Sequence, residues 1–233
     1  MADDIRTSTE CLAEKYQARL LGSRDLDAIM ALQREVIASV GDKMNVTFCA
    51  CDPEFFNTIM AGTGLVAGLV DGGELVASAA LRRLQPDEED ICINAGISDA
   101  RLPETARWHC MMVAPAHRGQ GLQRRLYAFM YAQGRRRGIH DIIGTVHGSN
   151  LPSLRNALAT GFRVIGVTRN RYADTLLLHN AGGAMPKYRL HREIESTDYF
   201  GQRRALAAGL RGFHLRTHAR GFYLQYGRQI TEG

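Results

Sequence analysis

The sequence predicts a mixed α/β fold, in which a mostly antiparallel sheet carries helices on both faces. Strand-like apolar runs alternate with amphipathic helical segments, in the order strand, two helices, three strands, helix, strand, helix and two strands. Two of the apolar runs flank Asp71-Gly72-Gly73, which predicts a β-hairpin over 65–81. The composition, 45% hydrophobic and 23% charged, is that of an ordinary globular protein.

In the N-terminal half, residues 16–21 have the composition of a first strand. The apolar stripe over 23–40 predicts a helix with Ser23 as N-cap. A short helix is expected over 52–60, capped by Asp52. The hairpin follows, and a polar loop over 83–104 is longer than most connections.

In the C-terminal half, a strand over 105–113 leads into a long amphipathic helix that ends at Gly138. A strand over 141–147 precedes a helix that Asn150 caps and Gly161 closes. One more strand follows, and residues 175–180 and 187–194 are weaker strand candidates.

We expect three parts along the chain: a mobile acidic leader over 1–15, one domain over 16–196 and a basic extension over 197–233. The leader lacks the apolar core of a signal peptide, and no apolar run approaches the ~18 residues of a membrane span, so we predict a cytoplasmic protein without membrane contact. The extension holds most of the net charge of +5. Its repeated Arg-Gly-Phe pattern predicts two extra strands or an arm that builds a homodimer, and RNA binding is the alternative.

The cysteines do not predict a metal site. Cys49 and Cys51 stand one residue apart, but no second Cys or His pair follows at the spacing that zinc requires. We therefore expect buried thiols here and no metal.

The turn after the strand that ends at Val113 is unusual. Gly119 and Gly121 surround Gln120, and Arg118 precedes them, directly before a helix. Unpaired N–H groups at a helix start attract anions, glycines allow close approach, and the arginine adds charge, so the turn predicts a pyrophosphate site. Neither the Walker loop nor the dinucleotide fingerprint fits these residues.

This turn resembles the acetyl-CoA signature of the GCN5-related N-acetyltransferase (GNAT) superfamily, Arg/Gln-x-x-Gly-x-Gly/Ala. It stands here as Arg118-Gly-Gln-Gly121-Leu-Gln123, in which Gln123 departs from the usual small residue. A second block over 145–166 resembles the family's fifth strand and fourth helix. Its matching residues are Asn150, Ser153, Gly161 and Phe162.

The resemblance implies the GNAT acyl-CoA N-acyltransferase fold, with two parallel strands that splay apart to hold the pantetheine arm of acetyl-CoA. The turn would hold the pyrophosphate, and an amine would attack the thioester directly. The implied acetyl-CoA-binding residues are Met112, Val113, Arg118, Gly119, Gln120, Gly121, Leu122, Gln123, Asn150, Ser153 and Asn156.

Attack needs a neutral amine, so a general base is expected near the thioester. The resemblance points to His109 and Glu104, on or just before the central strand, and His147 at the end of the next strand is a third candidate. Cys110 is expected to be a buried thiol rather than a nucleophile. At the position of the family's usual acid, a tyrosine, this chain has Ala157, which leaves Ser153, Tyr127, Tyr172, a water or unassisted thiolate departure.

These features together predict an acetyl-CoA-dependent N-acetyltransferase of a small-molecule primary amine. The acidic stretch 86–90 is a candidate contact for a cationic substrate. Two alternatives remain: a peptide or protein N-acetyltransferase, and a non-catalytic protein that binds acyl-CoA or RNA.

Overall fold

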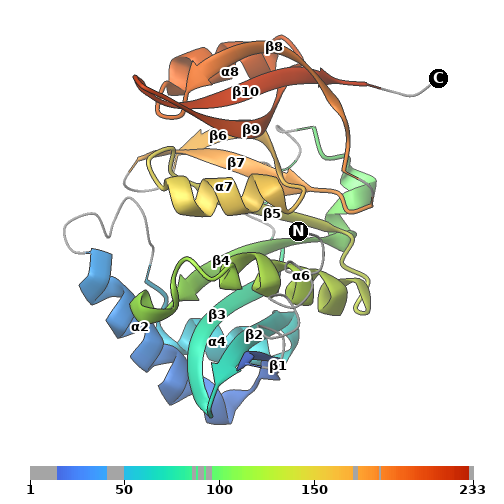
Figure 1. The fold of residues 1–233 in the computed structure, drawn as a ribbon. Helices are drawn as coiled ribbons and strands as arrows, with labels where there is room; N and C mark the ends of the chain where they lie inside the picture. The colour runs from blue at the N-terminus through green and yellow to red at the C-terminus, as the bar shows by residue number, and fades with distance from the viewer. Residues whose placement is uncertain are drawn as a thin grey trace, which may run out of the picture.

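The computed structural model describes residues 15–40, 50–85, 88, 92, 96–169, 173–183 and 185–230. Ten strands form one sheet in the order β1-β2-β3-β4-β5-β7-β6-β9-β10-β8 (Figure 1). All described pairs are antiparallel except that of β4 with β5. The predicted mostly antiparallel sheet with one parallel pair is therefore confirmed.

The N-terminal half follows the expected order. It consists of β1 (Gln17–Leu21), α2 (Leu26–Val40), α4 (Pro53–Thr58), β2 (Gly64–Asp71) and β3 (Glu74–Arg83). Asp52 caps α4 as predicted, with its Oδ1 accepting a hydrogen bond from the Phe55 backbone N–H at 2.7 Å. The prediction of Ser23 as N-cap is wrong, because a 3₁₀ turn over Ser23–Asp25 precedes α2 and Gly22 is its N-cap.

The central part contains β4 (Thr105–Val113), α6 (Leu122–Arg135), β5 (Asp141–Val146), α7 (Leu151–Ala159), β6 (Arg163–Arg169) and β7 (Asp174–Asn180). The helices α6 and α7 lie side by side (Figure 1). Trp108 of β4 contacts Tyr127 of α6, whereas the next residue, His109, contacts Phe55 of α4. Successive strand residues point to opposite faces, so the sheet carries helices on both faces, as predicted.

The C-terminal segment extends this same sheet. It consists of β8 (Tyr188–Glu195), α8 (Tyr199–Ala207), β9 (Arg211–His218) and β10 (Gly221–Gln229). β9 pairs with β6 through Val164 and Gly212, and β8 forms the far edge beyond β10. The two predicted tail strands are confirmed, and β8 joins them although we placed the boundary after residue 196.

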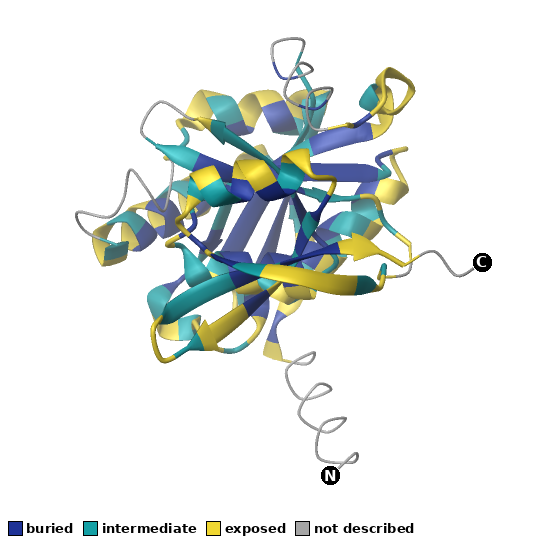
Figure 2. Cartoon of the chain, turned by 90° about the horizontal axis from the view of Figure 1, so that it is seen from above, coloured by how far each residue is buried: buried dark blue, intermediate teal, exposed yellow. Residues whose placement is uncertain are grey.

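The core runs through the whole sheet. In Figure 2 the central strands are buried and the exposed residues lie on the outer sides of the helices and on the edge strands. The main buried cluster includes residues from the first helix to the last strand, among them Ile29, Leu126, Leu178, Leu224 and Tyr226. The tail therefore contributes to the common core. No helix in the described part of the chain is long and apolar enough to cross a membrane.

Candidate active site

The central feature of the site is the wedge between β4 and β5. These parallel strands pair only over Thr105–Arg107 and Asp141–Ile143, although β4 continues to Val113 and β5 to Val146. Beyond Arg107 no further pairing of the two strands is described. Both strands run in the same direction, so their carboxyl ends meet at the open side of the wedge.

A β-bulge helps to open this wedge. On β3, Ala80 pairs with His109 and Ser78 pairs with Met112, so that Cys110 and Met111 stand opposite one residue. Cys110 has a φ of 49°, in the left-handed region that non-glycine residues rarely adopt. Bulges bend a strand and interrupt its ladder. On the side that faces the wedge, the backbone of β4 has no described strand partner beyond Arg107.

The glycine turn lies at the open end, directly after β4. Gly119 has a φ of 79° and Gly121, the N-cap of α6, has a φ of 73°. A Cβ atom added at either glycine would meet no atom within 4 Å. The glycines are thus required by the backbone conformation, and the space in front of them is open to a ligand. Two left-handed residues before a helix start form an anion-binding concavity.

Neighbouring side chains hold this turn in place. The Arg118 guanidinium donates from Nη2 to Ser39 Oγ at 2.7 Å and from Nε to the Val113 carbonyl at 3.3 Å. Arg118 is exposed, so its charge is available beside the glycines. Gln120 points elsewhere, because its Oε1 accepts a hydrogen bond from the buried Tyr16 hydroxyl at 2.6 Å. Gln120 is therefore positioned as a brace for the turn.

Gln123, the residue that departs from the family signature, joins α6 to α7. Its Nε2 donates to Ser153 Oγ and to Tyr127 Oη, both at 3.2 Å, and its Oε1 accepts from Asn156 Nδ2 at 2.9 Å. The structure thus brings Gln123, Ser153 and Asn156 together. Burial raises the pKa of Tyr127 above its usual range, which keeps this phenol protonated.

The remaining predicted binding residues have structural side chains. Asn150 Oδ1 accepts from the Ser153 backbone N–H at 3.4 Å and caps α7, as predicted. The side chains of Met112 and Leu122 are buried in the core, and the Val113 carbonyl accepts from Arg118. The side chains of Met112 and Leu122 are therefore not available to a ligand, and that of Val113 is partly buried.

His109 lies beside two arginines. Its ring is 5.0 Å from that of Phe55, and its Nε2 is buried with no hydrogen-bond partner among the described residues. Burial, followed by the charges of Arg107 and Arg82, lowers the pKa of His109 to about 3. The ring is therefore neutral at pH 7, and it is far too weakly basic to deprotonate an ammonium group of pKa ~10 efficiently.

The two arginines share one carboxylate. Glu88 Oε1 lies 2.9 Å from Arg107 Nη1 and 3.0 Å from Arg82 Nη2, and Glu88 is only 6% exposed. Glu88 is the described residue of the acidic stretch 86–90. The Glu88 carboxylate is buried and paired with both arginines, so it is not available to a substrate. For this residue the prediction of a substrate contact is wrong.

A small cavity of about 260 Å³ adjoins this cluster. Its lining residues are Asp52, Glu54, Phe55, Thr58 and Arg82. Two carboxylates and one guanidinium around an aromatic ring suit a small polar amine. The cavity lies on the His109 face of the sheet, because Phe55 contacts His109.

Glu104 lies at the closed end of the strand pair. It is exposed and directly precedes Thr105, the first residue paired with β5. Eight strand residues separate it from Val113, a distance of roughly 25 Å. The structure therefore does not bring Glu104 together with His147 or the glycine turn.

His147 lies at the open end, directly after β5. Its Nδ1 is 2.7 Å from Ser149 Oγ and accepts from the Ser149 backbone N–H at 3.2 Å. Burial lowers the pKa of His147, so the ring is neutral at pH 7. Because Nδ1 accepts the backbone N–H, the neutral ring carries its proton on Nε2. Ser149 is a functional candidate that the sequence reasoning missed, although it stands two residues from His147.

Tyr199 is the second functional candidate that the sequence reasoning missed. Its ring is 5.8 Å from that of His147, and its hydroxyl accepts from the Gly148 backbone N–H at 2.9 Å. Burial is the largest effect on the pKa of Tyr199 and raises it, so the phenol keeps its proton. No local signal marks Tyr199, because it comes from the C-terminal extension, 52 residues after His147. Tyr172, one of the acids considered, lies outside the described residues.

The structure corrects the expectation for two cysteines. Cys51 and Cys110 form a disulfide, with an S–S distance of 2.15 Å, where we expected buried thiols. The bond connects the segment before α4 to the bulge of β4. Cys49 lies outside the described residues. Within the described part of the chain, no group of three or more His, Cys, Asp or Glu side chains is arranged to hold a metal ion.

Comparisons with known proteins agree with this geometry. The family model described as Acetyltransferase (GNAT) family matches residues 32–162. No curated protein sequence matches the chain. Among solved structures, the ribosomal-protein-S18-alanine N-acetyltransferase from Escherichia coli has 18% identity and a TM-score of 0.55, and the match covers 72% of this chain and 96% of that one.

Two further structures have the same fold. A GCN5-related N-acetyltransferase from Kribbella flavida has 23% identity and a TM-score of 0.54, covering 72% of this chain and 98% of that one. The structure of yncA from Salmonella typhimurium with its cofactor acetyl-CoA has 19% identity and a TM-score of 0.53, covering 74% and 98%. At these identities the structures support the fold, while the family model covers more than half of the chain. The chain therefore belongs to the GNAT family and is an acetyl-CoA-dependent acetyltransferase.

Proposed function

We propose that this acetyltransferase transfers the acetyl group of acetyl-CoA to a primary amine of a small molecule. The observation that carries the proposal is the cavity of about 260 Å³ on the His109 face. A volume of this order suits a small acceptor. The carboxylates of Asp52 and Glu54 at this cavity would attract an ammonium group before it loses its proton.

The donor side of the proposal rests on the wedge and the glycine turn. Backbone N–H groups at Gly119 to Leu122 and the Arg118 guanidinium would hold the pyrophosphate, and freed backbone groups of Met112 and Val113 would pair with the pantetheine arm. Asn150 and the Gln123, Ser153 and Asn156 network would border the arm on the α7 side. Acetyl-CoA supplies an activated thioester, and the protein supplies position and proton transfer.

For the base we propose His147, acting through Ser149. The amine would give its proton to Ser149 Oγ while the Ser149 hydroxyl proton passes to Nδ1 of His147, 2.7 Å away. Both residues lie at the open end of the wedge, whereas Glu104 lies at the closed end. His109 is too weakly basic for this role and is better suited to shaping the acceptor cavity.

For the acid we propose Tyr199, in place of the tyrosine that Ala157 replaces. Its hydroxyl accepts the Gly148 N–H, so its own proton is free to be donated to a departing thiolate. Since a thiolate is only modestly basic, this help is worth less than that of the base.

The test is an acceptor screen with release of free CoA thiol as the readout. Polyamines, aminoglycosides and amino acids would be compared with peptides that carry a free N-terminus or a lysine, with the Arg118→Glu variant as the negative control. We expect turnover with a small amine. Turnover restricted to peptides would replace the proposal by the protein N-acetyltransferase alternative. CoA binding without turnover on any acceptor would favour the non-catalytic alternative.

We further propose a homodimer formed through the C-terminal extension, because Phe200 on α8 is 71% exposed. Light scattering of the wild type and of the Phe200→Ser variant tests it. A monomeric wild type would overturn this proposal. Cytoplasmic location stays a prediction.

A further inference from the structure

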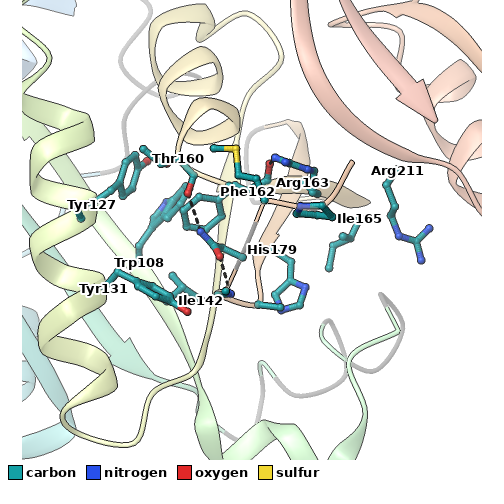
Figure 3. Close-up of a pocket in the computed structure, with 18 of the residues that line it drawn as sticks. Trp108, Tyr127, Tyr131, Ile142, Thr160, Phe162, Arg163, Ile165, His179 and Arg211 are labelled. Atoms are coloured by element: carbon teal, nitrogen blue, oxygen red, sulfur yellow. Dashed lines mark hydrogen bonds between the residues drawn. The ribbon is translucent and has the colours of Figure 1, made fainter. Parts of the chain in front are cut away.

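A second cavity lies away from the glycine turn. It has a volume of about 690 Å³ and is bordered by the second half of α6, the start of β6, the end of β7 and the loop that leads into β8 (Figure 3). Ile142 and Arg163, near the starts of β5 and β6, line it. The glycine turn lies at the carboxyl end of β4, so the two sites are at opposite ends of the parallel strands.

The inner wall of this cavity is aromatic. The Trp108 ring lies 4.8 Å from that of Tyr127 and 4.2 Å from that of Phe162. Trp108 lies against β5 at Gly144, where an added Cβ would come within 2.2 Å of the indole. The rings are tilted or edge-on to one another, so this wall is apolar and not flat, and it favours an apolar ligand.

Two arginines, Arg163 and Arg211, and one histidine, His179, line the cavity, and none of the described lining residues is acidic. Arg163 is only 8% exposed and forms no ion pair with any described residue. A buried cation without a carboxylate is costly, so an anion bound here would stabilise it.

The described hydrogen bonds of Arg163 go to two carbonyls and to Tyr188, and none goes to a carboxylate. Its Nη1 donates to the carbonyls of Leu158 and Phe162, at 3.2 and 2.6 Å, and its guanidinium lies 5.4 Å from the Tyr188 ring centre. Its Nε is buried and has no partner among the described residues. Buried donors in native proteins are rarely left without an acceptor.

The carboxylate that contacts His179 is already paired with a second basic residue. Asp141 Oδ1 lies 2.6 Å from His179 Nε2, and its Oδ2 accepts from Arg101 Nε at 2.6 Å. Asp141 is fully buried and does not line the cavity. It therefore holds His179 in place and leaves the cavity basic.

We propose that this cavity binds a small carboxylic acid with an apolar body, at a site separate from that of acetyl-CoA. The carboxylate lies on the basic side of the cavity, which Arg163 and Arg211 line, and the apolar body lies against Trp108, Tyr127 and Phe162. A volume of this size accommodates a ligand larger than a single aromatic ring.

The test uses phenylacetate as the acid and phenylacetamide as its uncharged analogue. Trp108 is the only tryptophan of the chain, so its fluorescence reports directly on this wall. Calorimetry gives the affinity. We expect phenylacetate to change the Trp108 emission and to bind about tenfold or more tightly than phenylacetamide, the usual effect of a charge-assisted hydrogen bond. Equal affinities, or no binding at millimolar concentration, would overturn the proposal.

Variants locate the site. Arg163→Gln should weaken phenylacetate binding about tenfold or more and leave that of phenylacetamide unchanged. Arg169→Gln, an exposed arginine at the other end of β6, is the matched control and should bind like the wild type. If Arg163→Gln does not fold, Arg211→Gln and Ala128→Phe, which lie at the same cavity, decide the question. Unchanged phenylacetate affinity in both would contradict the site.

Competition distinguishes the two sites. Saturating CoA should leave the phenylacetate affinity measurable, because the glycine turn is not part of this cavity. Displacement of phenylacetate by CoA would overturn the proposal of a separate site. This result does not depend on which amine the enzyme acetylates.

Discussion

At the scale of the residue, two histidines near the wedge have different environments. His109 is enclosed by Phe55 and two arginines, and its pKa falls to about 3. His147 has a pKa lowered by burial alone and a hydroxyl 2.7 Å from Nδ1. Only the second arrangement pairs a ring nitrogen with a hydroxyl, as the proposed base requires.

The environment of His109 predicts a pH-dependent stability. Between about pH 6.5 and pH 3 the unfolded chain binds a proton on this ring that the folded protein does not bind. The contribution of the neutral His109 ring to the unfolding free energy is therefore fully present above pH 6.5 and is lost as the pH falls toward 3. His109→Gln should reduce the slope of the unfolding free energy against pH by up to about 1.4 kcal/mol per pH unit.

Urea denaturation at pH 7, 6 and 5 measures this slope, and His191→Gln at an exposed position of β8 is the matched control. Turnover of His109→Gln at pH 7 should fall by far less than the ~10²- to 10⁴-fold that the loss of a general base costs. A slope equal to that of the wild type would contradict the buried, uncharged state of His109.

The proposed base predicts a pH profile. His147→Gln should lower kcat by about 10²- to 10⁴-fold at pH 7, and Ser149→Ala should lower it by less because a water can replace the hydroxyl. In the wild type, kcat/KM should fall on the acidic side only below pH 6.5, because burial lowers the pKa of His147 from that value. The profile is measured from pH 5 to 9, with CoA affinity as the control. If the kcat/KM profile of His147→Gln still falls on the acidic side as in the wild type, His147 is not the base.

At the scale of the element, the start of α6 combines three independent features. Two glycines have positive φ, the helix presents unpaired N–H groups, and Arg118 is fixed between Ser39 and Val113. Each feature favours an anion, and the space in front of the glycines is open.

This arrangement predicts the effect of two substitutions on CoA affinity. Arg118→Glu should weaken CoA binding by about 1 to 3 kcal/mol through loss of a charge-assisted hydrogen bond. Gly121→Val should weaken it as well, because a β-branched residue is strained at a φ of 73° and its side chain enters the ligand space.

Calorimetry with CoA gives the affinities, and circular dichroism checks the fold. The control is Arg136→Glu, an exposed arginine at the other end of α6, which should bind CoA like the wild type. Equal affinities for all three variants would show that the turn is not the CoA site.

At the scale of the whole molecule, the C-terminal extension is part of the sheet and contacts the residues that follow β5. Leu224 and Tyr226 are fully buried in the common core, and Tyr199 contacts Gly148 and His147. Removal of residues 197–233 would therefore expose this core.

The buried hydroxyl of Tyr226 tests whether the C-terminal extension shares the common core. Tyr226 donates to Gln202 Oε1 at 2.8 Å, and both residues are fully buried. Tyr226→Phe leaves that oxygen unsatisfied and should lower the unfolding free energy by about 1 to 3 kcal/mol. Tyr223→Phe, on the same strand, is the control and should change it little. A cooperative transition in which Tyr226→Phe is as stable as the wild type would mean that the extension does not share the core.

Most of the fold was predictable because its signals are local. The hairpin at Asp71-Gly72-Gly73, the caps Asp52 and Asn150 and the turn at Gly119 and Gly121 each depend on a few neighbouring residues. Conformational preference and hydrogen bonding to the adjacent backbone determine such features, so the sequence alone was sufficient. The failure at Ser23 is of the same local kind, since the first turn proved to be a 3₁₀ turn.

The chemistry of the site depends on residues far apart in the sequence. The low pKa of His109 requires burial and the charge of Arg82 on another strand, and Gln123 is held by Asn156, 33 residues later. Tyr199 reaches His147 only because the last strands complete the sheet. The order of the elements and the glycine turn before α6 follow from local sequence signals. The set of side chains that share a low-dielectric space follows from the tertiary structure, because burial and Coulomb interactions depend on distance in space.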